Sequence, residues 1–167
     1  SARSVSFKRV YNLDKAAMPL TEKHSSKSFD NDLHECIDLF MAMGQMSAEQ
    51  VTLATHALVD SNVELAKKVI EEDTKINQME IKVDELVVLL VAKRQPTASD
   101  LRLVMALSKG VVDLERVGDE ASKIARMACK LHKEGVSPRG YSEVQHLSNQ
   151  VRVMLLEALD AFLRMDP

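Results

Sequence analysis

Two stretches of the sequence place carboxylates one helical turn apart. Glu80 and Asp84 lie in EIKVD, and Glu115 and Asp119 lie in ERVGD. Residues four positions apart share one face of an α-helix, where like charges repel each other. A glycine inside the second pair, Gly118, adds a cost of roughly 1 kcal/mol in a helix interior. Such a costly arrangement points to a ligand, because a cation bound between the carboxylates turns their repulsion into attraction.

The first pair belongs to a longer polar stripe, whose members fall at i, i+4, i+7 and i+11: Asp73, Asn77, Glu80 and Asp84. On a helix these four positions lie within about 60° of one another. Lys and Arg are absent three and four residues away from three of the four paired acids. Only Asp119 has such neighbours, Arg116 and Lys123. The two acidic pairs therefore lack the cations that usually accompany a solvated salt-bridged face.

Carboxylate oxygens suit hard or borderline ions such as Mg²⁺, Mn²⁺, Ca²⁺ or iron. Two such pairs on neighbouring antiparallel helices would face a common ion, with Asp73 and Asn77 as additional ligands. The alternative is that each pair belongs to a solvated helix face, which is common in a chain that is 28% charged. Spacing alone leaves both interpretations open.

Other chemistries lack their parts. The sequence contains no GxxxxGK[ST], GxGxxG or GxSxG motif, so nucleotide hydrolysis and triad catalysis are not indicated. The five histidines, at positions 24, 34, 56, 132 and 146, are predicted to be surface or linker residues. We therefore predict no catalytic residues and no enzymatic activity.

Composition bounds the class of protein. The chain has 167 residues, 46% of them hydrophobic, with nine Met and no Trp, which is typical of packed helices. A net charge of −3 disfavours nucleic-acid binding. The longest apolar run, Leu86 to Ala92, falls far short of the ~20 residues that span a bilayer. Two widely separated cysteines, Cys36 and Cys129, are predicted to be reduced thiols, so we expect a cytoplasmic protein.

The carboxylates must be positioned by helices, and the pattern predicts four. Residues 1–27 read as an irregular segment, in which Met18 is a candidate initiator that would make the first seventeen residues an addition to the natural chain. Ser28 is the expected N-cap of a first helix that breaks at Asp60. A second helix is expected from about Val63 to Arg94, and a third from about Ala98 to His132 after Pro96 and a Thr97 cap.

Residues 133–140 read as a linker, and a fourth helix occupies 141–167. The predicted fold is all-α: an antiparallel three-helix bundle over 28–132, plus a fourth helix beginning a second bundle. The run from Leu86 to Ala92 is apolar around the whole helix. We therefore expect it to be buried on more than one side, as core under the first and third helices or, less favoured, as a subunit interface.

The fourth helix repeats the first at an offset of 104 residues. The paired positions keep their character: Leu155 with Val51, Ala158 with Ala54, and Phe162 with Leu58. A helix cannot bury its apolar face alone, so the repeat predicts a second three-helix unit of which only the first helix is present. We favour a truncated form of a longer protein over a fourth helix that packs on the bundle or on another subunit.

With this organisation in place, the sequence resembles the PhoU family of phosphate-uptake regulators. The resemblance is carried by AMG at Ala42 to Gly44, by VIEEDTKINQMEIKVDE at Val69 to Glu85, by QPTASDLRLV at Gln95 to Val104, and by DLERVGDEASKIARMA at Asp113 to Ala128.

The resemblance implies a cytoplasmic, non-enzymatic protein, often a homodimer, built from two three-helix bundles. It implies an adapter between the ATPase subunit of the phosphate ABC importer and the phosphate sensor histidine kinase, which represses phosphate-starvation signalling. It also implies a divalent or ferric ion (Fe, Mn, Mg or Zn), in some members a multinuclear cluster. The corresponding ligands here are Glu80, Asp84, Glu115 and Asp119, with Asp73 and Asn77 as additional candidates.

Two other function classes stay open at this stage. One is a carboxylate-bridged metalloprotein that stores metal or uses it for hydrolytic or redox chemistry, although no histidine is placed as a general base. The other is a purely structural dimerisation bundle whose acids are solvated.

Overall fold

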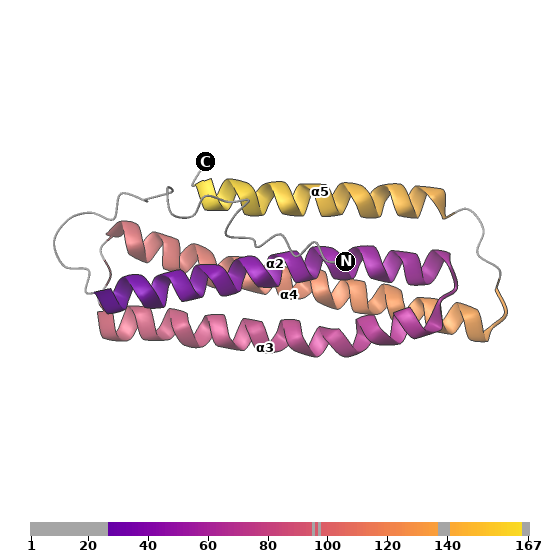
Figure 1. Cartoon of the computed structure of the whole chain (residues 1–167), viewed down its shortest axis with the longest axis horizontal. Helices are drawn as coiled ribbons and strands as arrows, with labels where there is room; N and C mark the ends of the chain where they lie inside the picture. Colours follow the sequence, from indigo (N-terminus) through magenta and orange to yellow (C-terminus); the bar gives the residue numbers. More distant parts are fainter. Residues whose placement is uncertain (1–26, 95, 97, 137–140, 165–167) are drawn as a thin grey trace, which may run out of the picture.

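The computed structural model describes residues 27–94, 96, 98–136 and 141–164, and these form four α-helices. Their bounds are α2 Lys27–Val59, α3 Val63–Arg94, α4 Ala98–Lys133 and α5 Ser142–Arg164. Figure 1 shows them lying lengthwise beside one another. The part of the chain that the structure describes is thus all-α, as predicted. None of its helices is both long enough and apolar enough to cross a bilayer.

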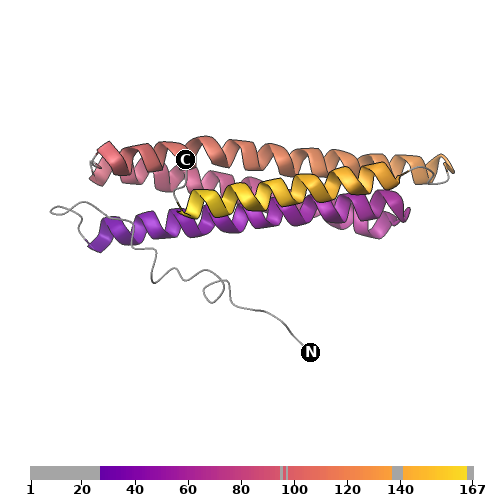
Figure 2. The ribbon, with the colours of Figure 1, turned by 90° about the horizontal axis from the view of Figure 1, so that it is seen from above.

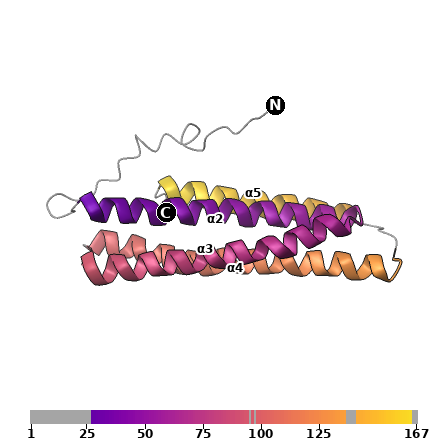
Figure 3. The same cartoon turned by 60° about the horizontal axis from the view of Figure 1, so that its bottom comes forward.

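Helices α2, α3 and α4 form the bundle, in which each helix packs against the other two. Helix α5 packs against α2 only, and it runs along α2 on the side away from α3 (Figures 2 and 3). The acidic stripes of α3 and α4 therefore belong to a three-helix unit that α5 does not cover.

Two clusters of buried residues make up the core. One holds large side chains from the end of the bundle nearest the α3–α4 turn, including Phe29, Leu33, Leu90 and Leu107. The other lies nearer the α2–α3 turn and consists mainly of alanines: Ala54, Ala57, Ala66, Ala121, Ala125 and Ala128. Small side chains let helix axes approach closely, so the bundle is tightest where the alanines meet.

The helix ends follow recognisable signals. The Asn62 side-chain Oδ1 accepts a hydrogen bond from the Leu65 amide at 3.0 Å, which caps α3, and Ser61 takes a positive φ of 51°. The predicted break after Val59 is therefore confirmed. Ser28, in contrast, is not an N-cap, because α2 already begins at Lys27. Met18, Thr97 and residues 165–167 lie outside the described residues.

The prediction that the run from Leu86 to Ala92 is buried on more than one side is wrong for this chain. Val87 and Leu90 are buried in the core, but Val88 is 66% exposed and Val91 is 40% exposed. Helix α3 has neighbours only in α2 and α4, so its outward face stays in contact with solvent.

The fourth helix docks on the bundle rather than standing apart from it. Leu159 is buried against Gly44 of α2, where a β-carbon would lie only 2.6 Å from the Leu159 Cδ1 atom. Other apolar side chains of α5, namely Leu147, Val151 and Met154, remain exposed. The α2–α5 contact therefore covers only one strip of α5.

Candidate functional site

The predicted acidic residues line the seam between α3 and α4. Asp73, Asn77 and Glu80 lie at the buried margin of α3, and Glu115 and Asp119 lie at the same margin of α4. Asp84 is exposed and stands at the outer edge of this group. The structure therefore brings the two stripes to facing positions, and Asp84 is the member farthest from the core.

Electrostatic effects show that the two stripes face each other across the seam. Burial raises the pKa of Glu80, and the negative charges of Asp84 and of Asp119 on α4 raise it further. Burial also raises the pKa of Glu115, followed by the charges of Asp119, Glu80 and Asp73, while Arg116 opposes these effects. The carboxylates repel one another between helices as well as within each helix.

Asp73 is the most deeply placed of these acids, with a relative exposure of 9%. Burial raises its pKa, and Asp119 raises it further, while Arg126 and Ser122 act in the opposite direction. A buried carboxylate with a raised pKa and an acidic neighbour is a common feature of ligand sites.

Three buried oxygens at the seam have no hydrogen-bond partner among the described residues: Asp73 Oδ1, Asn77 Oδ1 and Ser122 Oγ. Buried polar atoms are normally paired, because leaving one unpaired costs about 1–3 kcal/mol. Two of the three belong to the stripe that the sequence singled out. Oxygen-coordinated cations satisfy unpaired carboxylate and amide oxygens of this kind.

Gly118 explains how α4 comes so close to α3 at this point. A β-carbon at Gly118 would lie 2.8 Å from Ile76 Cδ1 and 3.6 Å from Asp73 Oδ1. The glycine thus lets Ile76 pack against the α4 backbone directly beside Asp73. Its cost to helix stability is exchanged for close approach of the two helices at the candidate site.

The donor chemistry fits a hard cation, but the side chains are not gathered around a single point. Within the described residues, no group of three His, Cys, Asp or Glu side chains is close enough to hold a metal ion. Coordination by more than two carboxylates therefore requires side-chain rotation. Half-exposed carboxylates on a helix face rotate readily, so the arrangement is compatible with ion binding without being preformed.

Exposed apolar side chains border the acidic seam. Val112 precedes Glu115 by one turn, and Val88 follows Asp84 by one turn, and both are exposed. Leu101, Met105 and Val91 extend the apolar border toward the α3–α4 turn. Charged groups beside exposed apolar residues are typical of protein interaction surfaces.

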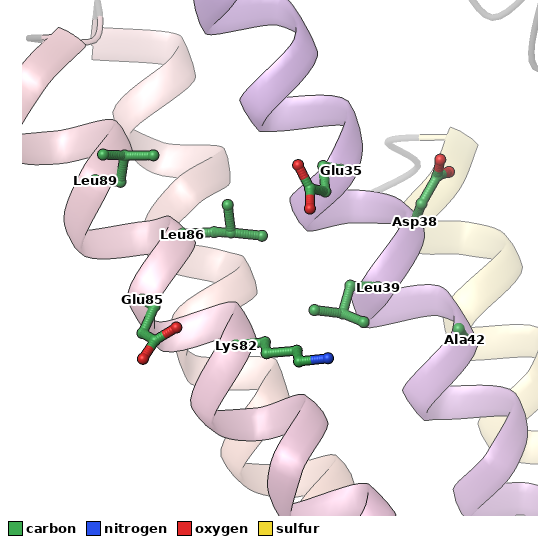
Figure 4. A pocket seen from close by; sticks show the side chains of 8 residues that line it. All are labelled: Glu35, Asp38, Leu39, Ala42, Lys82, Glu85, Leu86 and Leu89. Atoms are coloured by element: carbon green, nitrogen blue, oxygen red, sulfur yellow. The ribbon is translucent and has the colours of Figure 1, made fainter.

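A separate groove of about 750 Å³ lies between α2 and α3 (Figure 4). Leu39 and Leu86 project from the two helices into it, and Lys82 extends from α3 toward α2. Its carboxylates come from Glu35, Asp38 and Glu85. Cys36 lies beside it, and burial, with the charges of Glu35 and Asp84, raises the pKa of the Cys36 thiol to about 11. This cysteine is therefore a poor nucleophile and, like Cys129, a free thiol.

Sequence reasoning missed two residues of the seam, Ser122 and Arg126. Both line up with Asp119, three and seven residues further along α4, and both act on Asp73. Their i+3 and i+7 spacing was the available signal, but neither residue type stands out as a metal ligand.

Comparison with known proteins agrees with this architecture. Residues 40–128, which contain both acidic pairs, match the family described as PhoU domain. The chain is 52% identical over 143 residues to the Pseudomonas aeruginosa protein named phosphate-specific transport system accessory protein PhoU homolog. The chain belongs to the PhoU family. It is also 44% identical over 144 residues to the Escherichia coli protein named phosphate-specific transport system accessory protein PhoU.

Solved PhoU structures share the fold. The crystal structure of PhoU from Pseudomonas aeruginosa superimposes with a TM-score of 0.78 at 52% identity, covering 83% of this chain and 66% of that one. The phosphate transport system regulatory protein PhoU from Streptococcus pneumoniae superimposes with a TM-score of 0.71 at 30% identity, covering 80% of this chain and 62% of that one. The sequence alignments cover 86% of this chain and 59% of each of the two bacterial relatives named above.

Proposed function

We propose that the chain is a non-enzymatic regulator of phosphate uptake, acting in the cytoplasm as a homodimer. The proposal rests on its membership of the PhoU family and on the names of its relatives, which are accessory proteins of phosphate-specific transport systems. The observation that carries it to a site is the α3–α4 seam, where facing carboxylates and unpaired buried oxygens lie beside exposed apolar residues.

In this proposal the chain is an adapter between the ATPase subunit of the phosphate ABC importer and the phosphate sensor histidine kinase. The apolar border of the seam, formed by Val88, Val91, Leu101, Met105 and Val112, supplies the contact area. An interface of this kind holds a partner transiently, since its acidic centre disfavours the dry packing of an obligate complex.

A divalent or ferric ion would be held by Glu80, Asp84, Glu115 and Asp119, with Asp73 and Asn77 as further oxygen donors. When bound, it supplies positive charge that neutralises the seam. The residues themselves fix the position of this charge, because α3 and α4 are locked together by Ile76 against Gly118. Neutralising the seam lets a partner pack over it without leaving unpaired carboxylates.

A pull-down tests the adapter role. The purified chain is immobilised and presented with the detergent-solubilised phosphate importer and, separately, with the sensor kinase. We expect both to be retained, and we expect retention to fall at least tenfold when Val88 and Val112 are replaced by serine. The matched control is Leu147→Ser, which removes an equally exposed apolar side chain from α5.

Two results would contradict the adapter role. Retention of neither partner by the native chain would remove its basis. Equal loss in the seam variant and the α5 control would show that the seam is not the contact surface.

A further inference from the structure

A small polar pocket lies between α2 and α5, separate from the acidic seam. It has a volume of about 110 Å³ and is lined by polar side chains only. From α2 come Thr52, Thr55 and His56, and from α5 come Gln145, Ser148, Asn149 and Arg152. None of these seven side chains is a carboxylate, and each offers at least one hydrogen-bond donor in at least one protonation state or tautomer.

Arg152 provides the positive charge of the pocket. Its side chain is half-buried, and within the described part of the chain no carboxylate forms an ion pair with it. The nearest acids along α2 are Glu49 and Asp60, and neither lines the pocket. A guanidinium presents five N–H donors in a planar fork that matches the oxygens of carboxylates and phosphates.

A pair of hydroxyls crosses between the two helices at the base of the pocket. The Thr55 Oγ1 atom is buried and lies 3.0 Å from Ser148 Oγ and 2.9 Å from the Val51 carbonyl oxygen. Thr55 has a single hydroxyl proton. When it is donated to Ser148, the proton of Ser148 is left to donate into the pocket, and the bonds in such a chain strengthen one another.

Size and lining restrict the ligand. Sites for drug-sized molecules occupy about 300–1,000 Å³, so this pocket has room only for a compact group. The lining offers no apolar side chain for an organic ligand and no anionic oxygen for a metal ion. Converging donors from two helices, with one permanent positive charge, favour an ion that carries several acceptor oxygens.

We propose that this pocket binds a small tetrahedral oxyanion of the phosphate class. Arg152 and the Ser148 hydroxyl are its main donors from α5, and Thr52 and His56 reach it from α2. Because the donors come from both helices, the bound ion also ties α5 to α2. The proposal does not rest on the regulatory role or on the metal site, which involve other residues.

Equilibrium dialysis of the chelator-treated chain against labelled inorganic phosphate, at constant ionic strength, tests the proposal. We expect saturable binding that weakens roughly tenfold or more in Arg152→Gln, because a charge-assisted hydrogen bond is lost. Ser148→Ala should weaken it several-fold without changing the net charge. Arg102→Gln is the matched control, since it removes the same charge from an exposed position of α4. Circular dichroism checks that each variant is folded.

The outcomes separate the sources of the signal. No saturable phosphate binding by the native chain, or an equal loss in Arg152→Gln and Arg102→Gln, would overturn the proposal. Competition by sulfate supports an oxyanion site. AMP carries a phosphoryl group on a bulky nucleoside and should bind more weakly than phosphate; tighter binding of AMP would assign the pocket to a nucleotide instead.

A further variant distinguishes the pocket from the acidic seam. Phosphate binding should persist in Glu115→Ala/Asp119→Ala. Its disappearance there would mean that phosphate binds through ions held at the seam, which would also overturn the proposal.

Discussion

The α3–α4 seam and the α2–α5 pocket are opposites in charge. The seam gathers carboxylates and buried oxygens without an ion-paired cation, whereas the pocket gathers N–H and O–H donors around Arg152 without a carboxylate. Both lie where two helices meet, and in both the neighbouring helix does not compensate the charge. The comparison teaches that uncompensated polarity at a helix–helix contact identifies the sign of the ligand before it identifies the ligand.

The two contacts also differ in how they are anchored, and this difference predicts the largest effect. Ile76 is fully buried in the three-helix core, so Ile76→Ala should lower the free energy of unfolding of the whole bundle by about 2–5 kcal/mol. Urea denaturation followed by circular dichroism measures it.

Leu159→Ala sharpens the same comparison. Because α5 packs on α2 alone, we expect this change to speed hydrogen exchange in α5 while the protection of α3 and α4 changes little. Equal loss of protection in all four helices would show that α5 is an integral part of one cooperative core.

Gly118→Val probes the close approach of the helices beside Asp73. The new side chain would press on Ile76, so we expect a loss of about 1–3 kcal/mol in the free energy of unfolding. Lys109→Val introduces the same side chain at an exposed position of α4 and should change stability by less than about 0.5 kcal/mol. Equal effects of the two variants would mean that only helix propensity matters at position 118.

Glu115→Gln tests the repulsion within the seam. The pKa of Glu115 is raised in the folded state, so the folded chain binds this proton more tightly than the unfolded chain does. In metal-free protein the group therefore lowers stability as the pH rises from the unfolded pKa, near 4.3, through the raised folded value.

Glu115→Gln should accordingly be more stable than the native chain at pH 7, by a few tenths of a kcal/mol as for like charges on a helix. The difference should vanish at about pH 4, where both states are protonated. Thermal melting across this range measures it. Glu120→Gln is the control, because Glu120 pairs with Lys123 at 2.8 Å and its neutralisation should bring no gain.

The sequence predicted the helices well because their ends carry local signals. Asn62 supplies a side-chain cap and Pro96 cannot continue a helix, and both act within a few residues. The facing of the two acidic pairs followed from the same signals, since a short turn makes α3 and α4 antiparallel neighbours. The role of Gly118 in close approach was also correctly predicted.

Features that depend on which elements pack together were not predictable in this way. The apolar run of α3 has the composition of a buried helix, yet Val88 faces solvent because only two helices contact α3. The α2–α5 pocket joins His56 to Arg152, and no periodicity links residues so far apart. Ser28 failed as a cap because α2 begins one residue earlier.

Metal content tests the central claim most directly. The chain is purified without chelator and its bound metal is measured by elemental analysis, alongside Glu115→Ala/Asp119→Ala and the control Glu120→Gln. We predict a divalent or ferric ion in the native chain and in the control, and none in the double variant. Absence of metal from the native chain, with no change in its melting temperature on addition of Mn²⁺ or iron, would contradict the account and leave the seam as a solvated acidic face.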